Sequence, residues 1–183
     1  MTLILRMYED HKSVLDHLSS TSQVSDHATL QTTLPKVLLL AAASEFESRV
    51  CTTIREYVQA NSNDLKILEL VEQKAIKRQY HTLFDWDKRN AAKFWSLFGA
   101  DFKRQMGDIC RRRPRFERSI SAFLELGALR NQLVHNNYAT FSLEKTLTEV
   151  FDLYREAEGF VNSLPVVLHV AFTENDLDKT LPE

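Results

Sequence analysis

The stretch RFERSISAFLELGALRNQLVHNNY, residues 115–138, shows the pattern that organises this chain. Its apolar residues recur every three or four positions, which is the period of an amphipathic α-helix. The set expected to face inward is Phe116, Ile120, Phe123 and Leu124. Gly127 has no side chain and predicts the close approach of a neighbouring element. Three polar residues, Arg130, Asn131 and His135, stand at the C-terminal end of this predicted helix.

Apolar residues recur at helical spacing along most of the remaining chain as well. The predicted helices cover residues 2–19, 35–58, 64–76, 87–98, 101–110 and 142–164. Only four glycines and four prolines occur, which favours helices over a fold with many turns. We therefore predict an all-α fold, a helical bundle with a four- to five-helix core and extra short helices.

Polar and turn-forming residues predict where these helices begin and end. The Ser/Thr-rich segment SSTSQVSDHATLQTT, residues 19–33, predicts a loop, and Pro35 suits the first turn of the helix that follows it. Gly99 is expected to cap the end of one helix, and Pro165 is expected to end the last one. The predicted N-terminal caps are Asp64, Asp87 and Ser142.

Length and composition describe an ordinary globular protein. The 183 residues suffice for a single helical domain, with a core at about residues 35–164 and a tail over residues 165–183. We expect the tail to dock one short apolar segment and then to become disordered. The net charge of −2 confines any affinity for nucleic acid to a local patch.

The same composition sets expectations for the environment of the protein. Cys51 and Cys110 lack metal-ligand spacing and predict reduced thiols. No apolar run approaches the roughly 20 residues that span a bilayer. We therefore expect a cytoplasmic protein without a membrane partner, a metal or a cofactor.

The polar end of the 115–138 helix suggests phosphodiester chemistry. Asn131 and His135 are four positions apart and share a helix face, whereas Arg130 and His135 are separated by about 140° on a straight helix. Imidazole titrates near neutrality, and the guanidinium fork matches phosphate oxygens. The alternative is that Arg130 and His135 only interact with free carbonyls and with the helix dipole.

One concentration of positive charge stands out in this slightly acidic chain. Five arginines surround the predicted helix start at Pro114, with Glu117 as the single acid among them. They are Arg111, Arg112, Arg113, Arg115 and Arg118. The cluster is either an RNA-backbone patch or a solvated face paired with acids. Tyr138 is either a residue that stacks on a base or a packing residue.

Two further groups of polar residues are weaker candidates. Glu45 and Glu47 lie on the polar side of the predicted helix 35–58. They could supply an acidic partner near a cleft formed around Arg130 and His135. His81, Asp85 and Asp87 have the composition of metal ligands but lack the spacing of a known site, so we expect no metal there.

The sequence RNQLVH, residues 130–135, resembles the Arg-Asn-X3-His form of the R-X4-6-H motif of HEPN domains. HEPN domains are all-helical and are common in prokaryotic toxin and antiviral systems. FLELGALRNQLVHNNY, LLLAAASEFESRV near the start and AAKFWSLFG in the middle resemble the RiboL-PSP group of these proteins. The resemblance covers most of residues 35–164.

This resemblance implies a metal-independent endoribonuclease that acts as a toxin or as an antiviral, abortive-defence effector. His135 would act as the general base or acid, and Arg130 would bind the scissile phosphate and stabilise its transition state. Asn131 would position His135 or the phosphate. Attack by the ribose 2′-hydroxyl would leave a 2′,3′-cyclic phosphate and a 5′-hydroxyl.

The resemblance also implies partners. One histidine cannot easily serve as both base and acid, and HEPN proteins pair two motifs across a dimer interface. We therefore expect an RNA substrate and a homodimer in which two copies of Arg130 and His135 face one cleft. A neutralising antitoxin protein is a further partner to consider. The alternatives are a non-catalytic HEPN module that binds RNA or protein, and a purely structural helical adaptor.

Overall fold

A computed structural model describes residues 2–169, 176, 177 and 179 of the chain. The described residues form helices and connecting segments with no strand, which confirms the predicted all-α fold. The α-helices are α1 (Leu3–Ser20), α2 (Val24–Asn61), α3 (Leu65–Val71), α4 (Tyr80–Leu83), α5 (Ala92–Ser96), α6 (Ala100–Arg112), α7 (Pro114–His135) and α8 (Leu147–Val167). A short π-helix, Glu72–Ile76, continues α3.

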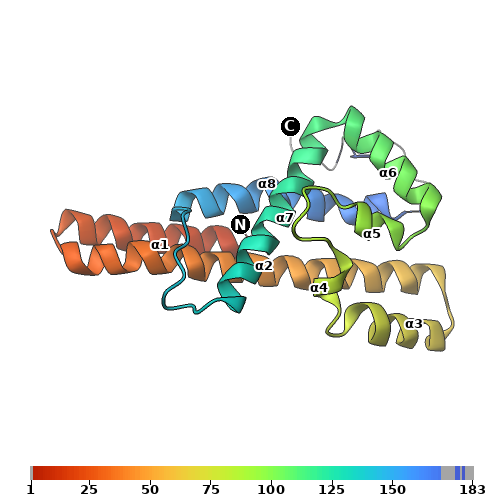
Figure 1. The fold of residues 1–183 in the computed structure, drawn as a ribbon, viewed down its shortest axis with the longest axis horizontal. Helices are drawn as coiled ribbons and strands as arrows, with labels where there is room; N and C mark the ends of the chain where they lie inside the picture. Colours follow the sequence, from red (N-terminus) through yellow and green to blue (C-terminus); the bar gives the residue numbers. More distant parts are fainter. Residues whose placement is uncertain (1, 170–175, 178, 180–183) are drawn as a thin grey trace.

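The core lies where α7 crosses α2 and α8 (Figure 1). The Phe123 ring of α7 is at its centre, with its centroid 4.8 Å from Phe160 of α8, 4.9 Å from Phe84 and 5.8 Å from Phe46 of α2. All four rings are buried, and each contributes about 1.5–3 kcal/mol by leaving water. One aromatic cluster therefore joins the three long helices to the segment between α4 and α5.

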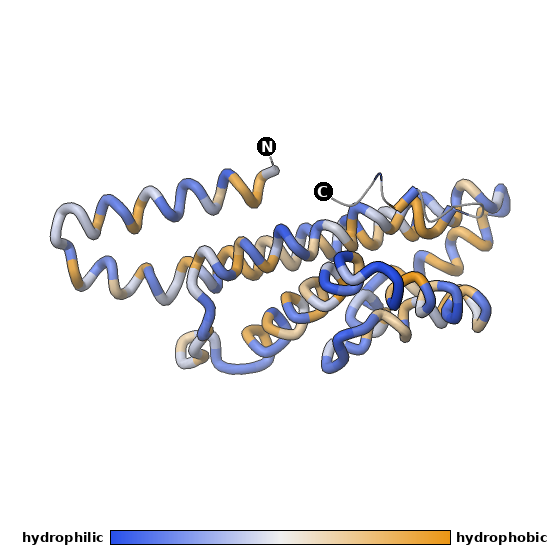
Figure 2. Tube along the Cα trace, turned by 90° about the horizontal axis from the view of Figure 1, so that it is seen from above, coloured by the Kyte–Doolittle hydropathy of each residue, from blue (hydrophilic) through white to orange (hydrophobic). Residues whose placement is uncertain are grey.

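α1 and the first half of α2 form an antiparallel hairpin that extends beyond the rest of the bundle (Figures 1 and 2). The predicted loop over residues 19–33 is wrong for most of that segment, because the turn covers only residues 21–23 and α2 begins at Val24. The threonine hydroxyls that suggested a loop bond to carbonyls of the same helix. Thr33, for example, donates to the carbonyl of Thr29 at 2.9 Å. Such bonds keep Ser/Thr-rich sequence compatible with a helix.

Pro35 lies in the middle of α2, so the prediction that it stands in the first turn of a helix is wrong. A proline inside a helix costs about 3 kcal/mol, because it removes a hydrogen bond and crowds the preceding turn. Packing offsets this cost, since Pro35 is buried. α1 is in turn held on the bundle by Tyr8, whose ring stacks on Phe151 of α8 with centroids 4.1 Å apart.

The start of α3 confirms a predicted cap, and the start of α5 corrects another. The Asp64 carboxylate accepts a hydrogen bond from the Lys66 amide at 2.9 Å, as expected of an N-cap. Asp87 does not cap α5. The Asn90 side chain accepts from the Ala92 amide at 3.2 Å instead, because it stands closer to the residue where the helix begins.

Two further helix ends differ from the predictions. α8 is capped by Thr146 rather than by Ser142, and Thr146 and Glu149 bind each other's backbone amides in a capping box. The reciprocal bonds satisfy two free amides at once, and they lower the pKa of the Glu149 carboxyl. Gly99 does not cap the end of α5, which stops at Ser96. It precedes α6 as the N-cap, with a positive φ of 105°.

The C-terminal region departs from the prediction at one position. Pro165 lies inside α8, which continues to Val167, so it does not end the helix. Leu177 is buried in the core. The predicted disorder of the tail over residues 165–183 concerns mainly residues outside the described ranges.

Gly127 receives the predicted close neighbour, which is the Trp86 side chain. A Cβ atom built on Gly127 would lie 2.1 Å from Cζ3 of the indole ring. The indole Nε1–H donates a hydrogen bond to the His81 carbonyl at 2.9 Å. The glycine therefore provides the space in which Trp86 fastens the α4 turn to α7.

Replacing Gly127 with alanine should expel the indole and lower the free energy of unfolding by about 1–3 kcal/mol, as overpacking does. Gly107→Ala in α6 is the matched control, because a Cβ atom there meets nothing within 4 Å. The control should raise stability by about 0.5–1 kcal/mol through helix propensity. Urea unfolding measures both changes. In a Trp86→Ala background Gly127→Ala should no longer destabilise, and equal effects of the two glycine replacements would contradict the contact.

Candidate active site

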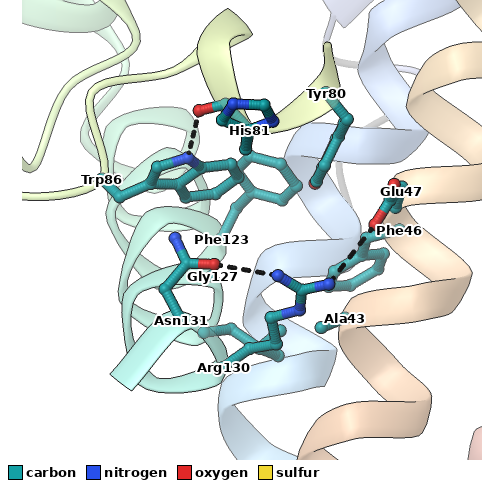
Figure 3. A pocket seen from close by; sticks show the side chains of 11 residues that line it. Ala43, Phe46, Glu47, Tyr80, His81, Trp86, Phe123, Gly127, Arg130 and Asn131 are labelled. Atoms are coloured by element: carbon teal, nitrogen blue, oxygen red, sulfur yellow. Dashed lines mark hydrogen bonds and ion pairs between the residues drawn. The ribbon is translucent and has the colours of Figure 1, made fainter. Parts of the chain in front are cut away.

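A pocket lies at the C-terminal end of α7, between that helix, α2 and the α4 turn. It brings together Arg130, Asn131 and His135, the three residues predicted as the site. The other lining residues are Glu47, Arg78, Tyr80, His81 and Trp86. Figure 3 shows an adjoining pocket that shares six of these lining residues, with the side chains of α4 opposite those of α7 and with Glu47 at the side.

Arg130 lies between two oxygen acceptors. Its Nη1–H donates to Oδ1 of Asn131 at 3.1 Å, and its Nη2 lies 4.0 Å from a carboxylate oxygen of Glu47 (Figure 3). The Arg130 side chain is 36% exposed, so a ligand in the pocket can reach the guanidinium. Asn131 thus orients Arg130, a contact that the sequence did not single out.

His135 is the last residue of α7 and is exposed. Asn136 caps the end of the helix, and its backbone and side-chain amides both donate to the Gln132 carbonyl, at 3.0 and 2.7 Å. Within the described part of the chain, the His135 imidazole makes no hydrogen bond to a carbonyl at this end. The part of the alternative interpretation in which His135 caps free carbonyls therefore has no support in the geometry, whereas its place in the last turn of α7 fits an interaction with the helix dipole.

The two candidate glutamates of α2, Glu45 and Glu47, have different surroundings. Glu47 lines the pocket and pairs with Arg130. Glu45 points elsewhere, because its carboxylate accepts from the Tyr154 hydroxyl at 2.9 Å and lies 3.4 Å from Arg49. Residues two positions apart face different sides of a helix, so only Glu47 is an acidic partner of the candidate site.

Sequence reasoning did not assign Tyr80, His81 or Arg78 to this pocket. Burial raises the pKa of the Tyr80 phenol well above its usual range, and Glu47 adds to the shift, so the hydroxyl stays neutral. His81 and Arg78 are exposed at the pocket. These residues belong to a segment without helical periodicity, so no local pattern in the sequence points to them.

The arginine cluster lies at the other end of α7. Arg115 and Arg130 are 15 positions apart, which places them roughly 22 Å apart along the helix axis. Arg111 pairs with Asp108, and Arg118 lies 3.8 Å from Glu156. Part of the cluster is thus a face paired with acids, as one of the two interpretations expected.

The remaining arginines and Tyr138 have other surroundings. Arg112 donates from Nε to the Asp108 carbonyl at 3.4 Å, and Arg113 is the N-cap residue of α7. Tyr138 follows α7 and is held by Lys36, whose Nζ donates to the tyrosine carbonyl at 3.2 Å and lies 5.2 Å from the ring centroid. Tyr138 is 42% exposed, and it does not line the pocket that holds Arg130.

The residues considered for metal binding do not form a cluster. Asp85 pairs with Lys88 at 3.3 Å, and His81 lines the pocket described above. Within the described ranges, no group of three His, Cys, Asp or Glu side chains is arranged to hold a metal ion. Cys51 and Cys110 are free thiols, and burial raises the pKa of Cys110 to about 11.

Comparison with known protein families identifies the family of this chain. The family model described as RiboL-PSP-HEPN matches residues 5–168. The chain belongs to the RiboL-PSP-HEPN family. The match begins at residue 5 rather than near residue 35, so this HEPN domain includes the α1–α2 hairpin. Comparisons with curated proteins and with solved structures found no match. Among the described residues, no helix has the length and apolarity that a bilayer crossing requires.

Glu47→Gln should strengthen RNA binding at this HEPN pocket, because it removes the negative charge closest to Arg130. At 4 Å in water one unit charge changes an interaction by about 1 kcal/mol, which corresponds to a gain of about fivefold in affinity. Fluorescence anisotropy with 2′-methoxy RNA measures affinity without cleavage. Glu45→Gln is the matched control, since it makes the same charge change on the same helix outside the pocket. Equal gains in both variants would show an effect of net charge alone.

Proposed function

We propose that this HEPN protein is a metal-independent endoribonuclease whose site is the pocket at the end of α7. HEPN proteins are generally associated with ribonuclease activity. On a straight helix Arg130 and His135 would point about 140° apart. The observation that carries the proposal is that both nevertheless line one pocket, together with Asn131. A phosphate bound to Arg130 would then stand beside an imidazole.

The groups of the pocket suit cleavage by the ribose 2′-hydroxyl. Arg130 offers a fork of donors to the scissile phosphate and is turned toward the pocket by Asn131. His135 transfers a proton to or from a reacting oxygen. Such proton transfer contributes about 10²–10⁴ in rate, and the guanidinium stabilises the additional charge of the transition state.

The biological role that fits this activity is that of a toxin or an antiviral, abortive-defence effector, and the support for it is the resemblance to HEPN effectors. A neutralising antitoxin protein belongs to the same proposal. The homodimer with two facing motifs stays a prediction. The argument for it, that one histidine cannot easily serve as both base and acid, is weakened by the presence of His81 in the pocket.

Purified protein should cut single-stranded RNA of mixed sequence in the presence of EDTA and leave 2′,3′-cyclic phosphate and 5′-hydroxyl ends. His135→Ala and Arg130→Ala should each lower the rate by about 10²–10⁴. His17→Ala is the control, since His17 is an exposed histidine of the hairpin. Gel analysis with end-group labelling measures both rate and products.

Two results of this experiment would contradict the proposal in different ways. Cleavage that persists in both His135→Ala and Arg130→Ala would remove the catalytic assignment. RNA that is retained but never cut by the wild type would favour the non-catalytic binding module. DNA of the same sequence should remain intact, because it lacks the attacking hydroxyl.

We further propose that the arginine cluster holds RNA on its way to the pocket, with Arg115 as the clearest test position. Arg115 is exposed, and it makes no hydrogen bond or ion pair with another described residue. Arg115→Ala should lower the affinity for long RNA. It should also reduce the slope of the logarithm of the binding constant against the logarithm of the salt concentration by about 0.7 per lost contact. It should leave cleavage of a dinucleotide unchanged. Lys12→Ala on the hairpin is the control, and equal losses in both variants would contradict a localised patch.

A further inference from the structure

The pocket contains two imidazoles that reach it from different elements. His135 ends α7, and His81 stands on the α4 turn, 54 positions earlier. Both line the pocket that also holds Arg130 and Asn131. In the adjoining pocket of Figure 3, the His81 side chain lies on the opposite side from the Arg130 guanidinium.

The backbone of His81 is held firmly although its ring is exposed. Its carbonyl accepts the indole hydrogen bond of Trp86 at 2.9 Å, and Trp86 lies directly on α7 at Gly127. The adjacent Tyr80 ring packs against Trp86, with centroids 5.6 Å apart. The α4 turn is therefore tied to the helix that carries Arg130, and His81 keeps its place relative to that arginine.

The charges around His81 come from three elements. Glu47 faces the pocket from α2, Arg130 from α7, and Arg78 from the segment before α4. The neutral Tyr80 hydroxyl is adjacent. Among the described residues, the His81 imidazole makes no hydrogen bond or ion pair. Neither ring nitrogen therefore has a structural role.

We infer that His81 and His135 are the two proton-transfer groups of one site within a single chain. The inference rests on the proposed endoribonuclease activity and names a second catalytic residue for it. One imidazole accepts the proton of the ribose 2′-hydroxyl as that oxygen bonds to phosphorus. The other, protonated, donates its proton to the 5′-oxygen as the bond between phosphorus and that oxygen breaks. No proton is gained or lost overall, and exchange with solvent restores both rings.

This assignment differs from a site shared between two subunits. Each chain would hold its own base, its own acid and its own phosphate-binding arginine. A homodimer would then carry two independent sites, and dimerisation would not be needed to complete the acid–base pair.

The rate of RNA cleavage should fall by about 10²–10⁴ in His81→Ala, as in His135→Ala. The double variant should lose little more than either single variant, because groups that act together are not additive. Wild-type protein should show a bell-shaped dependence of kcat/KM on pH, and each single variant should lose one arm of it. His17→Ala should behave as wild type, and circular dichroism should show unchanged helix content in every variant.

A substrate with sulfur in place of the 5′-oxygen identifies the acid, because a thiolate leaves without protonation. One of the two histidine variants should recover most of its rate on this substrate, and the other should not. Recovery in neither variant would overturn the assignment of a two-histidine pair. A His81→Ala protein with wild-type rate and an unchanged pH profile would do the same.

Mixing subunits separates a site within one chain from a site between chains. His81→Ala and His135→Ala proteins, refolded together, should remain as inactive as each alone, since no chain then holds both imidazoles. Recovery of about a quarter to a half of the wild-type rate would overturn the single-chain site. Absence of RNA cleavage by wild-type protein would overturn the proposed function itself, whereas normal cleavage with an innocuous His81→Ala change would overturn only this inference.

Discussion

The contact between Trp86 and the bare helix face at Gly127 is the constraint on which the candidate site depends. Only a glycine leaves room there, because any Cβ atom would overlap the indole ring. The same indole donates a hydrogen bond to the His81 carbonyl. A single side chain thus fixes the distance between α7 and the α4 turn, and the pocket exists because these two elements are held together at that spacing.

The electrostatics of the pocket follow from its position at the end of α7. Arg130 stands between the Asn131 amide oxygen and the Glu47 carboxylate, which orient the guanidinium without burying it. A pair with this exposure contributes little to stability, so an incoming phosphate can replace Glu47 at small cost. The neutral Tyr80 phenol adds a hydrogen-bond donor and no charge. The pocket is therefore suited to a single anionic group.

α7 connects two kinds of positive charge at its two ends. The arginines near its start are exposed or paired with acids such as Asp108 and Glu156, whereas Arg130 near its end faces a pocket. The separation of roughly 22 Å between Arg115 and Arg130 is too large for one phosphate and suits an extended polymer. The aromatic cluster around Phe123 holds the helix in place. The distance between its two ends is therefore fixed.

Sequence periodicity determined the all-α class, the start of α7 at Pro114 and the polar residues at its end, because these features depend on neighbours a few positions away. It failed at the hairpin and at Pro165, where tertiary packing keeps Ser/Thr-rich or proline-containing segments helical. It also left Arg130 and His135 unrelated in space. Only the tertiary structure placed them in one pocket, distinguished Glu47 from Glu45 as the acidic partner, and added His81 and Tyr80. Those residues come from α2 and the short helix α4, and contacts between distant parts of a chain leave no local pattern from which to predict them.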